Sequence, residues 1–364
     1  MIIVRSSKHT LKFANQIKQN QLEELMDVYR SILQDYVDKI WNKELPLKIN
    51  LSSKLLPDSN GINHSWWKQL IYKNASEIIR ANIKKKRTTT KPEVKNVGMN
   101  LDYRFFDHDQ NSSEFDEFIS IKLPWFQDRK KRSKTINLPI KNHIHSNKLL
   151  DWTRKKTVKL TKKDDQFYIH FTYEKEEPIK KSSGKSLGID VGYKTMIATS
   201  DKDLIGKDLE KIYEKISRKK QGSKSFNKTL TERDQRINYN INQMDLEDVN
   251  HLVVENLKNV KKNSKGKIFK KFNNKLQRWS YPKILLKLEH VCELNGIIFE
   301  KVSPAYTSQT CSSCGAIKKS NRKGEMYICS TCNMEMNADI NASINILHRG
   351  VYSPPNKKSE VYIK

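Results

Sequence analysis

Two closely spaced pairs of cysteines constrain the fold of this chain more than any other feature of its sequence. Cys311 and Cys314 form one C-x-x-C pair, Cys329 and Cys332 form a second, and residues 315–328 lie between the pairs. Each C-x-x-C turn presents two thiolates on one side. Two such turns can close a tetrahedral shell around one zinc ion, with no open position for a substrate water. The spacing therefore predicts a structural zinc site; four buried thiols without a metal are the alternative.

The use of cysteine and the lack of a long apolar segment bear on where the protein works. Paired thiols held for a metal are typical of a reducing compartment, where disulfides are rare. No stretch of the sequence approaches the ~20 apolar residues that a membrane helix needs. The first residues become charged too early for a signal peptide. We therefore expect an intracellular, soluble protein without a membrane partner.

Three acidic residues stand at positions where burial or a helix start is expected. Asp190 lies in an apolar strand sequence, Glu255 ends the apolar run at residues 252–254, and Asp339 opens a helical sequence after the second cysteine pair. For each residue alone, a salt bridge, a strand end or a helix N-cap is an ordinary role. Three carboxylates on two strands and a helix can instead converge on a pair of divalent cations. Such a pair activates water and stabilises the leaving oxygen of a phosphodiester.

The first half of the chain has the pattern of a β-rich domain interrupted by helices. Residues 20–41 place apolar side chains at three- and four-residue spacing, which predicts an amphipathic helix, and a second helical sequence occupies residues 62–86. Residues 11–15, before the first helix, are expected to form a strand. Short alternating runs follow over residues 96–175 and predict an antiparallel sheet or barrel.

The second half begins after a polar linker at residues 174–186 and has an α/β pattern. Strands alternate there with helices, which favours a sheet with parallel pairs. Cys292 is expected to be a core residue of an amphipathic helix. The tail beyond Leu347 is expected to be irregular because it contains two adjacent prolines. The buried hairpin, strand, helix and further strand expected in this half occupy residues 186–201, 250–256, 276–296 and 297–303.

The charge balance favours a nucleic-acid partner. The chain has 69 Lys and Arg against 41 Asp and Glu, a formal net charge of +28. Neutralising phosphates releases condensed counterions, so a chain this basic binds polyanions strongly. A charge run is ordinarily a solvated face, but the second of two basic clusters begins just after Glu255. The candidate nucleic-acid-binding residues in these clusters are Lys84, Lys85, Lys86, Arg87, Lys261, Lys262, Lys270 and Lys271.

Five segments, taken in order, resemble the motifs of a known family. They are SLGIDVGYKT, HLVVENLKN, YTSQTCSSCG, the second C-x-x-C pair and NADINASINIL. Together they resemble the three RuvC motifs and the inserted zinc ribbon of the transposon-encoded TnpB proteins. These proteins are relatives of the compact type V CRISPR effectors and of the eukaryotic Fanzor proteins. The resemblance is specific over about residues 184–348 and only architectural before them.

The resemblance implies an α+β multidomain protein with an N-terminal β-barrel wedge domain and a helical recognition insert. An RNase H-like (RuvC) α/β nuclease domain with an inserted zinc ribbon is expected to follow. The implied bounds are 1–15 and 96–178 for the wedge domain, 16–95 for the insert, 179–307 and 336–350 for the nuclease domain, 308–335 for the ribbon and 351–364 for an irregular tail.

The resemblance also implies a function. Asp190, Glu255 and Asp339 would be the catalytic carboxylates that hold magnesium, expected as a pair of ions, and the four cysteines would hold zinc. The protein would use a guide RNA to cleave matching target DNA beside a short flanking motif, by metal-dependent hydrolysis. Its expected location is the prokaryotic cytoplasm, on the nucleoid when bound to DNA.

The sequence departs from the family pattern at several positions. The His-Lys pair that usually precedes the glutamate motif is missing, and Asn337 and Ala338 stand where the family often has Asp-Arg. Glu325 replaces an Arg that commonly lies four residues before the third cysteine, although Arg322 lies close to it. We therefore include Arg322 among the candidate nucleic-acid-binding residues.

Three alternatives share part of the sequence pattern of the guided nuclease. A nuclease-inactive, RNA-guided DNA-binding repressor would share the fold and the guide, but its expected mark is the loss of a carboxylate. A transposase-type DNA-processing protein also uses three carboxylates and zinc, but the order of motifs favours the nuclease. An actin-like ATPase shares the GIDVG hairpin but needs further glycine-rich loops, which a chain with 12 unclustered glycines does not supply.

Overall fold

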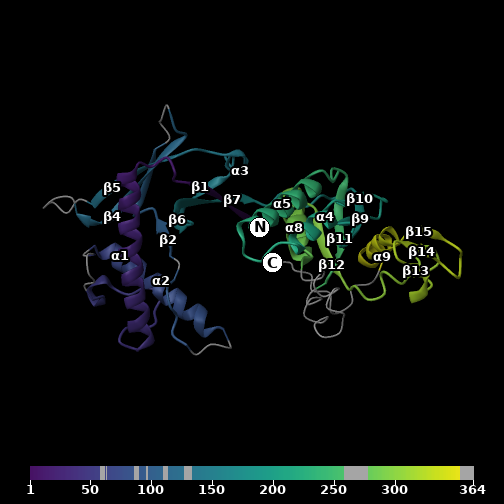
Figure 1. Ribbon diagram of the computed structural model, residues 1–364, viewed down its shortest axis with the longest axis horizontal. Coiled ribbons are helices and arrows are strands. Elements are labelled where there is room, and N and C mark those ends of the chain that lie inside the picture. The colour runs from purple at the N-terminus through teal and green to yellow at the C-terminus, as the bar shows by residue number, and fades with distance from the viewer. Residues whose placement is uncertain are drawn as a thin grey trace. The chain divides into compact units, whose positions relative to one another are not determined.

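The chain folds into two compact units, Met1–Glu176 and Glu177–Lys364, whose elements are labelled in Figure 1. The computed structural model describes residues 1–57, 62, 64–85, 90–95, 97–109, 114–126, 133–257 and 278–352. None of the helices in these ranges is both long enough and apolar enough to cross a bilayer. Six of the candidate basic residues lie outside the described residues: Lys86, Arg87, Lys261, Lys262, Lys270 and Lys271.

Two long helices of the first unit form as the apolar periodicity predicts. Helix α1 spans Gln16–Trp41 and helix α2 spans Ser65–Ile83, and the two pack against each other. A short 3-10 turn, η1 at Ser53–Leu55, lies between them in the sequence. The buried face of α1 consists of the residues that the three-and-four spacing selects: Leu22, Leu25, Met26, Tyr29, Ile32, Leu33, Tyr36, Val37 and Ile40.

The strand expected at residues 11–15 is not formed, and that prediction is wrong. The first strand, β1, is Ile2–Thr10 and ends before this segment. Leu11 and Ala14 are buried in the core, and the side chain of Asn15 accepts a hydrogen bond of 3.0 Å from the backbone N–H of Lys18. Asn15 therefore caps α1, and its cap requires a turn rather than a strand just before the helix.

The antiparallel strands expected over residues 96–175 are present and are divided between two sheets. The first sheet has the order β1-β7-β6-β2 and the second has the order β3-β4-β5. The closed barrel stays a prediction, whereas the antiparallel pairing is confirmed. Short helix α3 is Ile144–Asn147, and the strands after β1 are β2 at Gly98–Asp102, β3 at Phe106–Asp109, β4 at Glu117–Phe126, β5 at Ser133–Ile140, β6 at Thr153–Lys163 and β7 at Gln166–Glu176.

One buried ion pair ties the two sheets of the first unit together. Arg154 of β6 donates to both carboxylate oxygens of Glu117 in β4, at 2.7 and 3.1 Å. The guanidinium also lies 3.5 Å from the centre of the Phe171 ring. Glu117 is only 5% exposed. Removing one partner of a pair this buried costs about 3–5 kcal/mol, because an uncompensated charge is left behind.

The second unit is built on a five-stranded mixed sheet with the order β10-β9-β8-β11-β12. Strand β11 pairs in parallel with β8 on one side and β12 on the other, whereas β9 and β10 continue the sheet in antiparallel pairs. This confirms the buried hairpin and the α/β pattern expected from the sequence. The strands are β8 at Lys185–Asp190, β9 at Ile197–Thr199, β10 at Leu204–Ile205, β11 at Val249–Glu255 and β12 at Ile298–Val302.

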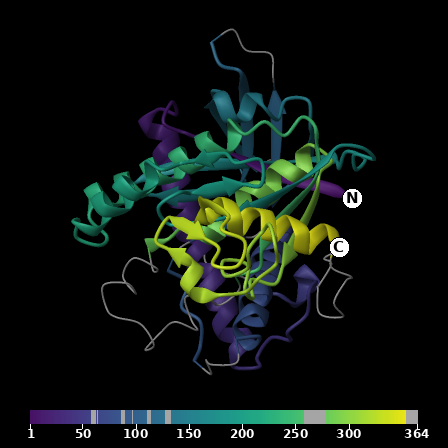
Figure 2. The same cartoon turned by 90° about the vertical axis from the view of Figure 1, so that its right-hand side faces the viewer.

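Helices cover both faces of this sheet. In β11, Leu252 and Val254 belong to one apolar core with Leu288 of α8, whereas Val253 between them belongs to another core with Ile346 of α9. Figures 1 and 2 show α9 on the sheet face opposite to α5 and α8. The helices that follow the sheet strands are α4 at Leu209–Ser217, α5 at Lys224–Asn242, α8 at Tyr281–Leu294 and α9 at Ala338–Tyr352.

Helix α9 lies directly on the sheet because a glycine, which has no side chain, stands at each of two close contacts between the helix and the sheet. A Cβ atom on Gly188 of β8 would lie 2.2 Å from the backbone oxygen of Ser343 in α9. A Cβ atom on Gly350 of α9 would lie 2.6 Å from Val253 of β11. The sequence from 348 to 352 was expected to be irregular, and this expectation is wrong. The helix continues to Tyr352 because its last turns, at Gly350, still pack against Val253 of β11.

A buried histidine makes the stability of the first unit depend on pH. His9 is 1% exposed; the hydroxyl of Ser7 donates to its Nε2 at 2.8 Å, and its Nδ1 lies 3.2 Å from the backbone oxygen of Lys141. Burial lowers the pKa of His9 below 6.5, and the positive charge of Arg154 adds to this effect. Both ring nitrogens are satisfied when the ring is neutral with its proton on Nδ1.

We expect the melting temperature of the chain to fall as the pH is lowered from about 7.5 to about 5.5. The unfolded chain takes up the His9 proton near pH 6.5 while the folded chain does not, so the stabilisation is lost below that pH by at most about 1.4 kcal/mol per pH unit. His9→Gln should make this fall less steep, whereas the control His108→Gln, at an exposed histidine, should not. Equal slopes in both variants would contradict the assignment to His9.

Candidate functional site

Parallel strand pairing brings the first two predicted carboxylates to the same edge of the sheet. Ile189 of β8 lies opposite Val254 of β11 in the register. Asp190 and Glu255 are the next residues along the two strands, and each is the last residue of its strand. Because the strands run in the same direction, their ends lie side by side.

The third carboxylate comes from the start of α9, and the helix cap beside it explains why its side chain is available. The side-chain oxygen of Asn337 accepts hydrogen bonds from the backbone N–H groups of Asp339 at 2.9 Å and Ile340 at 3.2 Å. Asn337 therefore fills the N-cap role that the sequence also allowed for Asp339. The Asp339 carboxylate is left to pair with Arg322, whose Nη2 lies 2.7 Å from its Oδ1.

Charge interactions link Asp190 to the other two carboxylates. Burial raises the pKa of Asp190 well above 3.8, and the negative charges of Glu255 and Asp339 raise it further, while Arg322 acts in the opposite direction. Burial also raises the pKa of Glu255 above 4.5, and this is opposed by a hydrogen bond from Thr307 and then by arginine charges. The structure therefore brings together the three acidic residues that the sequence singled out.

The carboxylates are not yet arranged as a closed metal shell. Among the residues that the structure describes, only the four cysteines form a group of metal-ligating side chains close enough together to hold one ion. Arg322 occupies an oxygen of Asp339, and the hydroxyl of Thr307 donates to Oε1 of Glu255. The donor set nevertheless fits magnesium, because carboxylate oxygens are its preferred protein ligands and a cation would relieve the repulsion between them.

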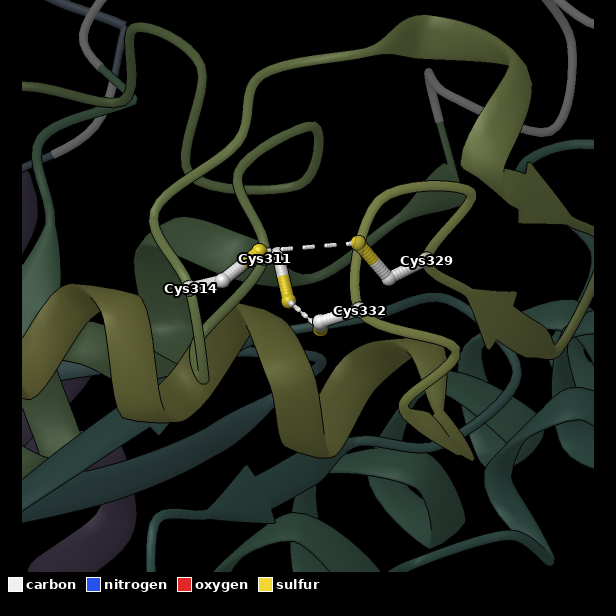
Figure 3. A group of neighbouring side chains, drawn as sticks. All are labelled: Cys311, Cys314, Cys329 and Cys332. Carbon is white, nitrogen blue, oxygen red and sulfur yellow. Dashed lines mark hydrogen bonds between the residues drawn. The ribbon is translucent and has the colours of Figure 1, made fainter.

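The four cysteines meet the geometry of a zinc site. Figure 3 shows the thiols turned toward one another from two loops, with all four Sγ atoms within 4.8 Å of one another. Cys311 and Cys332 are separated by 3.7 Å between sulfurs, as are Cys314 and Cys329. A tetrahedral zinc ion with bonds of about 2.3 Å separates its sulfurs by about 3.8 Å. The cysteine cluster therefore fits a four-thiolate zinc site.

A small three-stranded sheet surrounds the cysteine cluster. Its strands are β13 at Arg322–Lys323, β14 at Met326–Ile328 and β15 at Glu335–Asn337, with a 3-10 turn, η2, at Lys319–Asn321. Tyr327 is fully buried and its hydroxyl donates to the backbone oxygen of Gln309 at 3.0 Å. The backbone N–H groups of Cys332 and Thr331 lower the pKa of the Cys329 thiol to about 6, which favours the thiolate that a metal needs.

The three candidate basic residues that the structure describes lie in two different places. Lys84 and Lys85 are exposed at the end of α2, and Arg322 lies at the carboxylate site rather than on a separate surface. Sequence reasoning missed a basic groove of about 1080 Å³ in the first unit, between α1 and the sheet of β1, β7, β6 and β2. Cationic residues outnumber acidic ones in its lining. The cationic residues are Lys8, Arg30, Lys95, Lys159, Lys162 and Lys163, and the acidic residues are Glu23, Asp27, Asp164 and Asp165; Arg30 pairs with Asp27 and Lys162 with Glu23. The cationic residues are spread over distant segments, so no charge run marked them.

The described part of the site also contains residues to which the sequence motifs assigned no role. Thr307 lies within the quoted YTSQTCSSCG segment and Asn345 within NADINASINIL. The structure shows Thr307 bonded to Glu255, and Asn345 bonded to the backbone oxygens of Thr307 and Thr310 at 2.9 and 2.7 Å. In the sequence, only their positions within these two motifs connected Thr307 and Asn345 with the site.

Comparisons with known proteins agree with this geometry. The family model described as Cas12f1-like, TNB domain matches residues 281–346, which include the cysteine cluster and Asp339. The chain is 44% identical over 72 residues to a CRISPR-associated endodeoxyribonuclease Cas12f1 from Sulfoacidibacillus thermotolerans, covering 20% of this chain and 17% of that protein. It is 28% identical over 99 residues to a TnpB-like protein from Methanocaldococcus jannaschii, covering 27% of this chain and 34% of that protein.

The fold is shared over a larger part of the chain. A solved Cas12f1–sgRNA–target DNA complex matches 91% of this chain and 81% of the solved chain, with a TM-score of 0.54 and 18% sequence identity. The predicted resemblance to TnpB proteins and compact type V effectors is therefore confirmed, as is a mixed α/β multidomain fold. The sequence matches span only 17% and 34% of the two relatives named above.

We expect the protein to purify with about one zinc ion per chain, held by the four thiolates. Cys329→Ser should lower the zinc content and unfold the ribbon, since thiolate binding supplies roughly 10–16 kcal/mol of folding free energy in zinc-finger peptides. Metal analysis and thermal melting measure both effects. Cys292→Ala is the control, because Cys292 is buried in α8 away from the cluster and its loss should leave the zinc content intact. Unchanged zinc in Cys329→Ser would contradict the four-thiolate site.

Proposed function

We propose that this chain, a relative of TnpB and Cas12f proteins, is an RNA-guided DNA endonuclease that hydrolyses phosphodiester bonds with divalent metal ions. The convergence of Asp190, Glu255 and Asp339 at the ends of β8 and β11 and the start of α9 carries this proposal. Structural carboxylates in a sheet are normally paired with cations one by one. The charges of Glu255 and Asp339 both raise the pKa of Asp190, and a bound cation would relieve this effect, which favours a role of the three residues as ligands of metal ions.

The residues of the site have distinct roles in the proposed reaction. Asp190, Glu255 and Asp339 would hold the magnesium ions, expected as a pair. Magnesium bound there would supply an activated water and neutralise charge on the leaving oxygen. The ends of β8 and β11 fix two of the carboxylates on rigid parallel strands, and the capped first turn of α9 fixes the third. The guanidinium of Arg322, which pairs with Asp339, would bind a phosphate oxygen of the substrate.

The proposed partners are a guide RNA and a target DNA. The net charge of +28, the exposed Lys84 and Lys85, and the basic groove of the first unit all favour phosphate binding. We propose that the two units correspond to the wedge domain with its helical insert and to the RuvC-like domain with its ribbon. Target sequence would be read by pairing with the guide, beside a short flanking motif contacted by protein, in the cytoplasm of a prokaryote.

The nuclease-inactive repressor remains the second candidate because of one observation. Arg322 forms an ion pair with Asp339 at 2.7 Å, and this pair occupies a proposed metal ligand. The absent His-Lys pair and the residues Asn337 and Ala338 at the family's Asp-Arg positions point in the same direction. All three carboxylates are nevertheless present and converge, which favours the active enzyme.

Asp190→Asn, Glu255→Gln and Asp339→Asn should each lower magnesium-dependent cleavage of guide-matched DNA by at least about 100-fold, because each removes a charged metal ligand. Guided DNA binding should persist, since base pairing and backbone contacts do not require the carboxylates. Cleavage and gel-shift assays on the same preparations measure both. The matched control is Asp201→Asn, an exposed aspartate paired with Lys185. Guided binding without cleavage by the unmodified chain would favour the repressor.

The basic groove makes a separate prediction about salt. Replacing Lys8 and Lys159 by Gln should flatten the slope of log affinity for the guide RNA against log salt by about 1.4–1.8 units, at roughly 0.7–0.9 per phosphate contact. Both lysines are exposed and line the groove. Lys43→Gln with Lys148→Gln removes the same charge from exposed positions outside the groove and is the control. Equal slopes for the two double variants would show that the groove is not the RNA interface.

A further inference from the structure

The segment between β12 and the first zinc-ligand cysteine is held by side chains from one face of α9. Asn341 donates to the backbone oxygen of Thr310 at 2.8 Å, and Asn345 donates to the backbone oxygens of Thr307 and Thr310. One helical turn further, Arg349 donates to the backbone oxygens at 303 and 305 at 2.6 and 2.7 Å. These side chains recur every four residues, so they lie along one face of the helix. The helix that carries Asp339 therefore also clamps this segment.

The clamped segment presents one buried hydroxyl to the carboxylate site. Thr307 is 2% exposed, and its Oγ1 donates a short hydrogen bond to Oε1 of Glu255. The same hydroxyl lies 3.1 Å from the backbone oxygen of Pro304. A threonine hydroxyl has one proton, and an ionised carboxylate is a stronger acceptor than a peptide oxygen. The hydroxyl is therefore directed to Glu255 when the carboxylate carries its charge.

We propose that Thr307 is a positioning residue for Glu255: its buried hydroxyl fixes the rotation of the carboxylate so that the group is set for the metal ions. Asn345 holds the backbone of Thr307, so α9 sets both Asp339 and, through Thr307, Glu255. This inference rests on the proposed nuclease function. It assigns to Thr307 no contact with substrate or metal.

A turn-stabilising role for Thr307 is the simpler alternative, and the geometry argues against it. The backbone of the segment is already held by five side-chain hydrogen bonds from α9. The hydroxyl is not needed to hold the turn. Asp190 ends the neighbouring strand, so its charge would turn the Glu255 carboxylate away from it, and a donor on one oxygen opposes that rotation. Removing such outer hydrogen bonds typically weakens metal binding or activity by about 10- to 100-fold.

The test compares three single variants of the full chain with its RNA. Thr307→Val removes the hydroxyl and keeps the branched shape, whereas Thr307→Ser keeps the hydroxyl and removes the methyl group. Thr310→Val is the matched control, because its hydroxyl, in the same segment, donates to the backbone oxygen of Tyr306 and not to a carboxylate. The readouts are direct Mn²⁺ binding by electron paramagnetic resonance, the Mn²⁺ concentration that gives half-maximal cleavage, and the melting temperature. Glu255→Gln identifies the Mn²⁺ signal that belongs to the carboxylate site.

We expect Thr307→Val to weaken Mn²⁺ binding at this site by about 10- to 100-fold and to raise the metal requirement for cleavage similarly. Thr307→Ser and Thr310→Val should bind Mn²⁺ like the unmodified chain. The proposal is overturned if Thr307→Val binds Mn²⁺ as tightly as Thr310→Val, or if the Ser and Val variants at 307 are weakened equally, since keeping the hydroxyl would then give no advantage over losing it.

The nuclease proposal and the positioning role fail in distinguishable ways. If the unmodified chain binds Mn²⁺ in a manner sensitive to Glu255→Gln but cuts no DNA, the nuclease proposal fails. The role of Thr307 is then decided by the binding measurements alone. An unmodified chain without such Mn²⁺ binding overturns both. A loss of folding in Thr307→Val is recognised by its melting temperature, and Thr307→Ser then decides: weakened Mn²⁺ binding in that folded variant overturns the proposal.

Discussion

Repulsion among three carboxylates is the force that the second unit has to resist. Asp190 and Glu255 are fixed side by side because their strands are parallel neighbours, and Asp339 is fixed by the helix that packs on the same strands. Burial raises the pKa of Asp190, and the charges of Glu255 and Asp339 raise it further. A cluster of this kind is stable only where cations and donors offset it. These cations and donors are supplied by the elements that surround the three carboxylates.

The offsetting groups come from three different segments. Arg322 comes from the ribbon, Thr307 from the segment that leads into the ribbon, and Arg349 from the last turns of α9. The positive charges of Arg349 and Arg322 both act to lower the pKa of Glu255. In the sequence the ribbon lies between β12 and α9. The segment that leads from β12 into the ribbon carries Thr307, and the ribbon leads directly into the first turn of α9, which carries Asp339. The fold of the ribbon and the charge balance of the site are therefore linked through covalent connections as well as through contacts.

The sequence predicted those parts of the molecule that depend on local pattern. The cysteine spacing indicated the metal-binding ribbon, and the period of two or 3.6 indicated α1, β6, β7 and β11. It failed where a side chain has two local roles. Asn15 was included in the strand expected at residues 11–15, but its side chain accepts from the N–H of Lys18 and caps the helix instead. Asp339 could be an N-cap, and the decision depends on Asn337 taking that position first.

The parts that sequence could not predict depend on residues that meet only after folding. Arg322 and Asp339 are too far apart in the sequence for helix or strand periodicity to predict their contact. The two residues pair only when the ribbon has folded. The same holds for the hydroxyl of Thr307, which meets Glu255 across the sheet edge. The basic groove draws Lys8 from β1 and Lys159 from β6, which lie about 150 residues apart in the sequence and belong to no common charge run. Such sites follow from sheet topology rather than from a run of like residues.

Among the residues that the structure describes, two ion pairs join the ribbon to the rest of its unit, and the pairs differ in how far they are exposed to solvent. Lys194 and Glu325 lie 2.8 Å apart, but their side chains are 60% and 63% exposed, so water and salt screen the pair. In the Arg322–Asp339 pair, Asp339 is only 16% exposed. Short hydrogen bonds at the start of α9 add to this pair: the N–H of Ala338 donates to the backbone oxygen of Glu325 at 2.8 Å. The ribbon is therefore held mainly at the start of α9, where the third carboxylate stands.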